Sequence, residues 1–493
     1  MRCSRQSVAY GVSMPRLASG RRLSAALVAF LLAGCSGFEP LAEPDTTAPT
    51  RYLQEPARPG APLPLDWPAV FGSAELTHLV HDARIDNLDI AAASARILQA
   101  EAQAGVAGSA LFPQLSGNAN ASTSLNPGTM QKDSPPFRSS ISHSYSLGLS
   151  ASYTLDIWGK NAAGLEAARQ LAVQARYNRD VTTLSTVAAV VNGYFNILAA
   201  EDRIGIAREN VRTADRVLAA IRGRLSVGTA TALDVAQEES IVATQRASIP
   251  PLEQQVAQQK FALAVLLGQP PEALTLKDGS LAGLKVPGVA VGLPSELLVR
   301  RPDVAAAEAG LKSAHANVAS ARAAFFPSID LSARGGLESI TLKTLLRPDA
   351  AFYQLTAGLT QPIFDGFNLE NQLANERGRY LELLETYRKA IISAFSDVES
   401  ALVAVRKTNE HLRLQLAVVD ASRRAYMISE QRLREGTIDI VTLSQTQSTL
   451  FQAQDQLVQI KLQRLQAVVS LYQALGGGWT KEDIATRAPG DGK

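Results

Sequence analysis

The chain of 493 residues has only two cysteines, few aromatic residues and almost no net charge. Its formal charge of +2 at pH 7 indicates no basic surface for nucleic acid. A mean hydropathy of +0.01 argues against a membrane protein built from many transmembrane helices. Aromatic residues make up 6% of the chain, against 46% for all hydrophobic residues, so Ala, Leu and Val supply most of the apolar surface. This composition favours long, thin helical packing over a thick aromatic core.

The sequence also lacks the patterns on which many enzymes depend. It contains no phosphate-binding loop, no G-x-S-x-G nucleophile motif and no HExxH zinc motif. His78 and His81 have the spacing of metal ligands, but no cluster of cysteines or carboxylates completes a site. We expect a solvated helix face there. The sequence therefore predicts that the protein is not an enzyme and needs no metal and no cofactor.

The N-terminal residues predict export from the cytoplasm. Arg16, Arg21 and Arg22 precede the apolar stretch LSAALVAFLLAG, which is too short for a transmembrane helix and has the pattern of a secretory signal. Met1 and Met14 are both start sites that fit this pattern, and Met14 gives a signal of ordinary length. The sequence leaves this choice open.

Cys35 is the predicted end of that signal. The preceding Leu-Ala-Gly resembles a bacterial lipobox, which implies that Cys35 becomes the mature N-terminus and carries diacylglycerol and palmitate. A generic cleavage site with a chance cysteine is the alternative. Cys3 is removed with the signal, so the mature chain has no disulfide. Ser36 follows the cysteine, and the absence of Asp there favours the outer membrane over the inner membrane.

Two strand pairs interrupt an otherwise helical pattern. In each strand, apolar residues alternate with Ser, Asn, Thr, Gln or Gly, as in a strand with one apolar and one wet face. Each strand is about as long as the ~9–11 residues that cross a bilayer obliquely. The polar faces suit a water-filled lumen better than a packed core. The predicted strands cover about 113–125, 143–155, 327–337 and 352–363.

The two strand pairs belong to an internal duplication. Aligning the halves matches Pro113 with Pro327, Gly159 with Gly366, Arg224 with Arg432, Gly228 with Gly436, and Gly268 with Gly476. The offsets are 214, 207, 208, 208 and 208 residues, which is too constant for chance. The predicted divisions are a signal peptide (1–34), a lipid-anchored Pro-rich arm (35–72), a first repeat with helices to about 267 and a linker (73–294), a second repeat with long helices (295–478) and a tail (479–493).

The strands and helices together predict an oligomer. Residues 367–434, if helical throughout, would extend about 100 Å, which is typical of a coiled coil or a helical barrel. A sheet in a membrane cannot leave open edges, because unpaired backbone groups cost several kcal/mol in hydrocarbon. Four strands cannot close around a wide pore, whereas three copies would supply twelve strands. A soluble protein with two half-buried hairpins on a helical bundle is the alternative.

Several motifs in order resemble a known family. RRPDV at 300–304, FFPSIDL at 325–331, RLREGT at 432–437 and YQALGGGW at 472–479 resemble the TolC-type outer-membrane efflux proteins, and specifically their NodT-type lipoprotein branch. The resemblance covers nearly the whole mature chain. It implies a mainly α fold with a membrane β-barrel: a trimer that forms a 12-stranded outer-membrane β-barrel, four strands per chain, on a long periplasmic α-helical barrel with an equatorial domain.

The resemblance also implies a function. The trimer would be a passive duct in a tripartite efflux pump, exporting drugs or other small molecules from the periplasm or an inner-membrane pump to the exterior. Its partners would be a periplasmic adaptor (membrane fusion protein), an inner-membrane pump of the resistance-nodulation-division (RND) class and outer-membrane lipid. A periplasmic adaptor or structural envelope lipoprotein, and a lipid-anchored envelope enzyme, are the alternatives. The exported substrates and the cognate pump are not readable from the sequence.

Two turns are predicted to contact the adaptor. In the resembling family, V-G-T-like turns at the ends of the helical hairpins meet the adaptor. Glycine also fits a tight helix reversal because it tolerates positive φ, so a purely structural role is the alternative. The matching residues here are Val227, Gly228, Thr229, Glu435, Gly436 and Thr437.

A periplasmic gate is predicted beside the second turn. The family's Tyr, acidic and Arg positions match Tyr426, Glu430 and Arg434. Glu430 and Arg434 are four residues apart and share a helix face, so a solvated surface ion pair is the alternative. Ile438 stands where many relatives have Asp, and Asp439 one residue later is the substitute. Thr442 and Gln445 occupy positions where other members place inward-facing aspartates, which puts the inner carboxylate ring and its cation preference in doubt.

Overall fold

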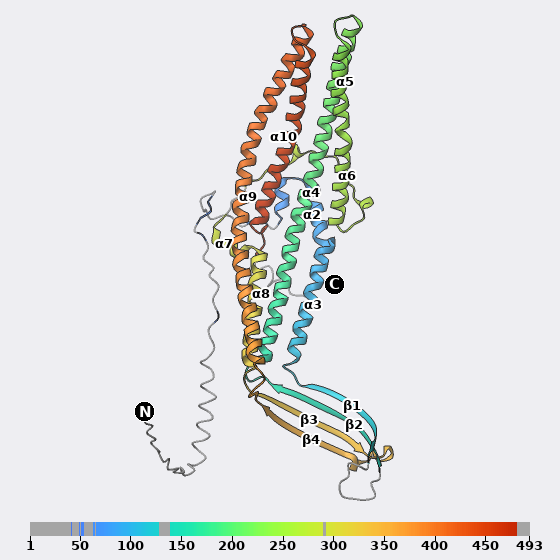
Figure 1. Ribbon diagram of the computed structural model, residues 1–493, viewed down its shortest axis with the longest axis vertical. Coiled ribbons are helices and arrows are strands. Elements are labelled where there is room, and N and C mark those ends of the chain that lie inside the picture. Colours follow the sequence, from blue (N-terminus) through green and yellow to red (C-terminus); the bar gives the residue numbers. More distant parts are fainter. Residues whose placement is uncertain are drawn as a thin grey trace, which may run out of the picture. The chain divides into compact units, whose positions relative to one another are not determined.

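The structure is a computed structural model that describes residues 41, 49, 51–53, 63–64, 66–127, 139–288 and 292–480. The chain divides into two compact units, Met1–Pro44 and Asp45–Lys493, and every element below belongs to the second. Within that unit, the strands lie at one end of the helices and two helix hairpins end at the other (Figure 1). The predicted signal peptide and Cys35 lie outside the described residues.

Nine α-helices in the described part of the chain follow the predicted order, and two of them are very long. Helices α4 and α9 have 67 residues each, which corresponds to about 100 Å. Helix α9 covers nearly the residues expected from the sequence. The bounds are α2 (Ala74–Asp86), α3 (Leu88–Ser109), α4 (Lys160–Ser226), α5 (Ala232–Ala247), α6 (Ile249–Leu266), α7 (Pro294–Arg300), α8 (Pro302–Ala323), α9 (Asn368–Arg434) and α10 (Ile440–Ala474).

Four strands form one antiparallel sheet in the order β1-β2-β3-β4. The two pairs therefore join through β2 and β3, which come from different halves of the duplication. Among the described residues, both outer strands, β1 and β4, have one edge without a partner strand. The bounds are β1 (Gln114–Asn126), β2 (Ser140–Leu155), β3 (Ser328–Ser339) and β4 (Ala351–Thr360), which shifts each end by at most three residues from the sequence estimate.

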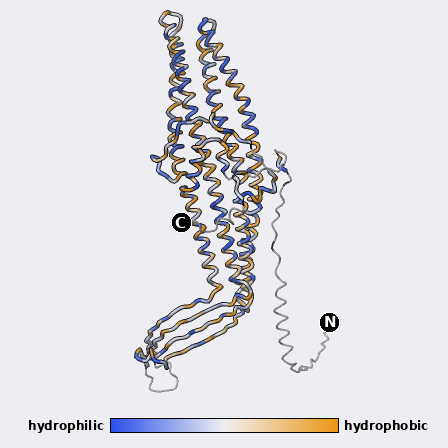
Figure 2. The backbone as a smooth tube through the Cα atoms, turned by 180° about the vertical axis from the view of Figure 1, so that it is seen from behind, coloured by the Kyte–Doolittle hydropathy of each residue, from blue (hydrophilic) through white to orange (hydrophobic). Residues whose placement is uncertain are grey.

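The register puts the apolar residues of all four strands on one face, except Phe352 of β4, which pairs with Gly336 on the polar face. Leu147 of β2 pairs with Ala119 of β1 and with Leu337 of β3, and paired residues share a face. Opposite them, Ser150 pairs with Ser116 and with Arg334 on the polar face. Hydrophobic and hydrophilic positions accordingly mix along each strand in Figure 2. The apolar face is exposed in the single chain, with exposed fractions of 58% for Leu149, 72% for Leu115, 76% for Leu355 and 84% for Tyr353.

The main core lies in the middle of the helices. Phe195 of α4 is fully buried and packs edge-on against Phe71 at a ring-centre distance of 5.1 Å. Trp67 stacks on Tyr472 of α10 at 5.1 Å. Trp67 and Phe71 belong to a short 3-10 helix (Trp67–Phe71) at the end of the predicted Pro-rich arm. One 18-residue window of α4 is apolar enough to cross a membrane, but 61% of it is buried inside the protein, as in the core helix of a bundle.

Equivalent glycines of the two repeats have the same conformation and the same environment. Gly268 and Gly476 both have positive φ, +66° and +87°. A Cβ on Gly268 would lie 2.1 Å from the carbonyl oxygen of Asp86, and one on Gly476 would lie 1.9 Å from that of Arg300. The duplication expected from the sequence is therefore present in the backbone.

The side chains beside these glycines are also equivalent in the two repeats. Asn87, which caps α3, donates from Nδ2 to the carbonyl oxygen of Leu266 at 2.7 Å. Arg301, which precedes α8, donates to the carbonyl oxygen of Ala474 at 3.2 Å. Leu266 and Ala474 are the last residues of α6 and α10. In both repeats, one side chain thus binds the end of the second hairpin helix to the start of another helix.

Candidate functional site: the two ends of a helical duct

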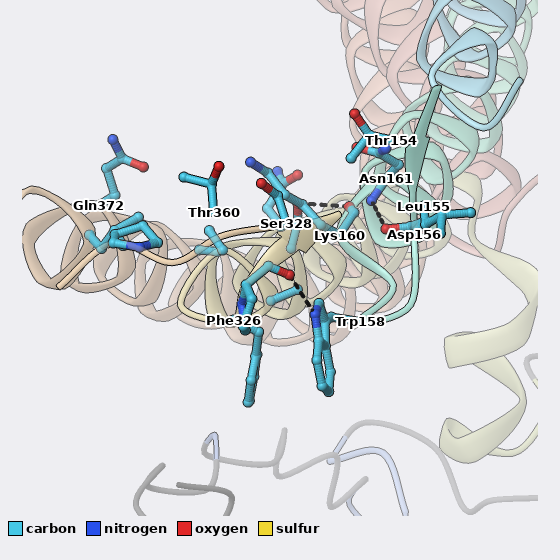
Figure 3. A pocket seen from close by; sticks show the side chains of 18 of the residues that line it. Thr154, Leu155, Asp156, Trp158, Lys160, Asn161, Phe326, Ser328, Thr360 and Gln372 are labelled. Atoms are coloured by element: carbon cyan, nitrogen blue, oxygen red, sulfur yellow. Dashed lines mark hydrogen bonds between the residues drawn. The ribbon is translucent and has the colours of Figure 1, made fainter. Parts of the chain in front are cut away.

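A polar cavity lies where the strands meet the helices (Figure 3). It has a volume of about 870 Å³ and is lined by residues of β2, β3, β4, α4, α8 and α9. The carboxylate of Asp156 accepts from the backbone N–H groups of Asn161 and Ala162, at 3.0 and 2.7 Å, at the start of α4. Asp365 accepts in the same way from Asn368 and Leu369 at the start of α9. The first turn of each long helix is therefore capped by an aspartate that lies between the preceding strand and the helix.

Exposed aromatic residues surround this junction. The indole of Trp158 stacks on Phe326 at 4.8 Å and donates to the carbonyl oxygen of Pro327 at 2.8 Å. In Figure 3 both rings point the same way, out of the cavity. Phe112 before β1 and Phe364 after β4 are 69% and 81% exposed. All four strand–helix junctions thus carry an aromatic ring, the arrangement that is typical of a membrane–water interface.

At the opposite end, two hairpin turns repeat each other. Gly228 and Gly436 have φ of +80° and +72°, and no atom lies within 4 Å of a Cβ placed on either. The N–H of Thr229 donates to the carbonyl oxygen of Arg224, and that of Thr437 to Arg432, each at 2.9 Å. Both threonine hydroxyls donate to the same carbonyl oxygens at 3.1 Å. The six predicted turn residues therefore form two open, equivalent tips, and a contact with an adaptor there stays a prediction.

Arg224 ties the first hairpin to the second, a role that sequence reasoning did not foresee. Its guanidinium donates to the carbonyl oxygens of Leu433 and, at 3.1 Å, of Arg434. These are carbonyls of the last turn of α9, where the helix dipole favours a cation. The alignment of Arg224 with Arg432 was the one available signal for this contact.

The predicted gate residues lie together on α9 beside this contact. Tyr426 is buried, and burial raises its pKa to about 12. Arg434 donates to Glu430 at 2.5 Å, and the Arg434 side chain is 74% exposed. With Arg224, these three residues line a cavity of about 180 Å³ between α4 and α9. The ion pair expected as the alternative to a gate is thus present, and gating stays a prediction.

Asp439 is separated from that cavity and caps α10. Its carboxylate accepts from the N–H and the hydroxyl of Thr442 at 2.9 and 2.7 Å. These hydrogen bonds lower the pKa of the exposed Asp439 carboxyl. The carboxylate is therefore held as an anion at the tip, but its hydrogen bonds are those of an ordinary helix cap.

Glu238 of α5 is a buried carboxyl group that the sequence did not reveal. It has no exposed surface and lies against Gln447 and Ser444 of α10. Among the described residues, neither carboxylate oxygen has a hydrogen-bond partner of ordinary geometry. Burial raises the pKa of Glu238 to about 7. Its neighbours in the sequence are polar, so only the packing of the two hairpins could identify it.

The two closely spaced histidines form no metal site. His78 pairs with Asp82 at 2.8 Å and its side chain is 75% exposed. In the described part of the chain, no group of three or more His, Cys, Asp or Glu side chains could hold a metal ion. His78 therefore lies on a solvated helix face.

Comparison with known proteins defines the class. The family model described as outer membrane efflux protein matches residues 79–269 and 293–477. These two segments coincide with the two repeats and cover most of the chain. The protein belongs to the outer membrane efflux protein family.

Relatives and solved structures agree with this assignment. The pyoverdine export outer membrane protein OpmQ of Pseudomonas aeruginosa is 38% identical over 94% of this chain and 98% of its own length. The probable efflux pump outer membrane protein TtgC of Pseudomonas putida is 32% identical over 93% of this chain and 96% of its own length. The outer-membrane channel OprN has a TM-score of 0.81 at 26% identity, covering 90% of this chain and 99% of its own. The Neisseria gonorrhoeae MtrE outer membrane channel in its open state has a TM-score of 0.79 at 27% identity. This match covers 91% of this chain and 99% of the MtrE chain.

These findings confirm the predicted fold class, function class and location. The protein is an outer-membrane efflux channel, mainly α with a membrane β-barrel that trimers complete from four strands per chain. The family and its relatives are channel proteins. The alternative of a soluble bundle with two half-buried hairpins is wrong, because the apolar strand faces belong to a membrane barrel.

Proposed function

We propose that this protein is the outer-membrane duct of a tripartite efflux pump and receives its cargo from an inner-membrane pump through a periplasmic adaptor. The observation that carries the proposal is that one chain contains both a sheet and very long helices. The sheet has one apolar and one polar face, and the helices are about 100 Å long. The sheet suits a bilayer, and the helices reach far into the periplasm.

The transport itself needs no chemistry in this chain. The polar face of the sheet carries Ser, Asn, Gln and Thr side chains, which a water-filled lumen keeps solvated. Solutes would pass such a surface with weak contacts, so the pump would supply both energy and selectivity. In this proposal the pump is of the RND class, and the adaptor contacts the two tips that contain Gly228 and Gly436.

The cargo to test first follows from the relatives. The two OpmQ proteins, 38% and 39% identical to this chain, are named for pyoverdine export. The cation efflux protein CusC is 28% identical. We therefore propose a siderophore of the pyoverdine kind before metal cations as the exported class.

Lipid attachment at Cys35 is a further part of the proposal. The Leu-Ala-Gly-Cys stretch at 32–35 supports it. Labelling with radioactive palmitate should mark the wild-type protein and not the Cys35→Ser variant. Label retained by the variant would refute acylation at this residue. The barrel spans the membrane by itself, so we expect the unacylated variant to keep part of its function.

The decisive experiment combines location, assembly and transport. The protein should enter the outer-membrane fraction and run as a trimer that dissociates on heating. A strain without it should retain pyoverdine-like siderophore in the periplasm, and expression of the chain should restore export. As a matched test of the adaptor contact, Gly436→Trp should reduce adaptor crosslinking, whereas Gly378→Trp, near the start of α9 and far from the tip, should not. Trimers with normal crosslinking for both variants would exclude these tips as the adaptor site.

A further inference from the structure

Phe352 of β4 is an aromatic residue on the polar face of the sheet. It pairs with Gly336 of β3, which in turn pairs with Gly148 of β2. The other Phe, Tyr and Trp residues of the four strands lie on the apolar face, and these are Tyr145, Tyr153 and Tyr353. The polar face of a membrane barrel lines its water-filled lumen. The stability of the barrel therefore does not require an aromatic side chain at position 352.

Arg334 of β3 is the one Lys or Arg on the polar face of the described strands, where the other charged residues are Asp330 and Glu338. Arg334 is exposed, and within the part of the chain that the structure describes its side chain has no hydrogen bond or ion pair. Asp330 instead accepts from Thr154 at 2.6 Å and from Ser328 at 3.1 Å. Each carboxylate is about 14 Å from Arg334 along the strand, which exceeds the Debye length of about 8 Å at physiological ionic strength. The Arg334 guanidinium is therefore available to a solute.

The aromatic residue and the arginine are diagonal neighbours on adjacent strands. Arg334 pairs with Gln354, which is two residues from Phe352 and on the same face of β4. Diagonal neighbours in an antiparallel pair are about 7–8 Å apart, a distance that long and aromatic side chains can bridge. A guanidinium and an apolar ring therefore border the same part of the lumen wall.

The wall beside these two side chains is bare backbone. A Cβ on Gly336 would lie 2.3 Å from the carbonyl oxygen of Leu147, and one on Gly148 would lie 3.0 Å from that of Gly335. The close approach of β2 and β3 therefore requires glycine here. Because Gly336 and Gly148 follow one another across the two strands, no side chain stands beside Phe352 in that direction. We call Arg334, Phe352, Gly336 and Gly148 together the Arg334–Phe352 patch.

We propose that the Arg334–Phe352 patch binds an aromatic anion during its passage through the lumen: a flat ring that carries carboxylate or phenolate oxygens. The ring would lie on the bare backbone of the two glycines and against Phe352, and its oxygens would accept two parallel N–H groups of Arg334. Glu338 lies two residues beyond Gly336 on the same face, so hydroxyl groups of the ring would face its carboxylate. The inference rests on the proposed function and names the chemical class of the cargo, a siderophore whose iron-binding oxygens are on an aromatic ring.

The dimensions of the barrel bring every solute close to this patch. A closed barrel of twelve strands, spaced about 4.8 Å apart and tilted by about 40°, has a radius of roughly 12 Å. Because the arginine side chains extend inward, a passing anion stays within about one Debye length of an Arg334, and the low-dielectric wall strengthens the attraction. On the described strands, the rings of Asp330 and Glu338 repel the same anion. An anionic cargo therefore depends on Arg334 as the attractive charge of this part of the lumen.

Binding of a small probe to purified full-length trimers in detergent tests the proposal. The probe is 2,3-dihydroxybenzoate, and saturation-transfer NMR measures its dissociation constant. Arg334→Gln should weaken binding at least fivefold, because a charge-assisted hydrogen bond is lost, and Phe352→Ala at least twofold. Arg334→Lys keeps the charge without the bidentate geometry and should retain part of the binding. Cyclohexanecarboxylate, which has the charge but no aromatic ring, should bind wild type at least fivefold more weakly than the probe does.

Two matched controls separate the patch from general effects of charge and aromatic area. Tyr353→Ala removes the aromatic neighbour of Phe352 on the apolar face, and Arg347→Gln removes an exposed arginine between β3 and β4. Both variants should bind the probe as wild type does.

The outcomes distinguish this inference from the proposed function. Intact wild-type trimers that do not bind the probe, or that bind it no better than Arg334→Gln and Phe352→Ala do, would overturn the patch and leave the duct standing. Binding that is lost in both variants supports the patch. If siderophore export in cells then proved independent of this chain, the proposed cargo would be wrong, and the patch would remain as a site for another aromatic anion.

Discussion

Glu238 of α5 and Gln447 of α10 lie against each other in the interface between the two hairpins, and neither side chain has any exposed surface. Tyr426 of α9 is close enough to Glu238 to feel its charge. The carboxyl group is therefore enclosed by groups that do not carry a positive charge. An ionised Glu238 would be a buried anion with only the neutral side chains of Gln447 and Ser444 to stabilise it, which is costly.

This arrangement predicts that the hairpin interface weakens as the pH rises. Burial raises the pKa of Glu238 from 4.5 to about 7, so between these values the folded state binds more protons than the unfolded state. Stability then falls as the pH rises through this window. Glu238→Gln should remove this dependence and stabilise the helices at pH 8 by roughly 2 kcal/mol relative to wild type, with little change at pH 4.

Circular dichroism of the helices during heating in detergent checks this prediction. Glu239→Gln is the matched control, because Glu239 is exposed and pairs with Arg222, and an exposed pair contributes about 0–1 kcal/mol. The prediction is wrong if the unfolding midpoint of the wild-type protein rises between pH 5 and pH 8 while that of Glu238→Gln does not. Glu238 would then stabilise the folded state more at high pH than at low pH.

Gly476→Ala should prevent correct docking of α10 on α7 and α8. The added Cβ would lie 1.9 Å from the carbonyl oxygen of Arg300, at a residue with φ of +87°. Strain of this kind costs on the order of 1–3 kcal/mol before the clash is added. Semi-native gels of outer membranes should show a several-fold loss of trimer. Gly378→Ala inside α9, where an added Cβ has no atom within 4 Å, is the control. It should leave the amount of trimer unchanged or slightly higher, because alanine favours a helix over glycine.

The double variant Arg434→Ser, Tyr426→Phe should loosen the resting tip. It removes the ion pair with Glu430 and the hydroxyl of a buried tyrosine that lines the same cavity as Arg224. We expect a higher single-channel conductance in a planar bilayer. Arg388→Ser, which breaks an exposed pair with Glu385 in the same helix, is the control. If the double variant conducts like wild type while its trimers remain intact, the constriction is formed by other residues.

Trp158 should stabilise the junction between sheet and helices through two separable contacts. Trp158→Phe keeps an aromatic ring against Phe326 and loses the hydrogen bond to Pro327, which is worth about 1 kcal/mol. Trp158→Ala loses both. The temperature at which trimers dissociate on a gel should therefore fall in the order wild type, Phe, Ala. Equal dissociation temperatures for the two variants would mean that the hydrogen bond carries the whole effect.

Much of this architecture could be predicted because its patterns are local. The alternation of residues such as Leu147 and Leu149 with Ser or Gly is a property of the strand itself, and the register then places them on one face. The segment 367–434, which contains no proline, likewise predicts α9. Glycines at a constant offset predicted turns that the backbone repeats.

What could not be predicted depends on contacts between distant segments. Glu238 has an ordinary polar sequence around it, and only α10 buries it. The sequence predicts helices to about 267 without placing the break between α5 and α6 at Ser248, where Pro250 and Pro251 fit the first turn of α6. Asn87 similarly divides α2 from α3 because its side chain binds the distant carbonyl of Leu266.

The open edges of β1 and β4 have a consequence for inheritance and dosage. Each chain contributes two strand edges to the ring, one to each of two seams, so a chain that folds but cannot pair at one edge still occupies a place in an assembly. With equal amounts of wild-type and edge-defective chain, only about one trimer in eight would be free of the defect if chains mix at random. A lesion in either outer strand should therefore be dominant over the wild-type gene, whereas a chain that never folds should be recessive.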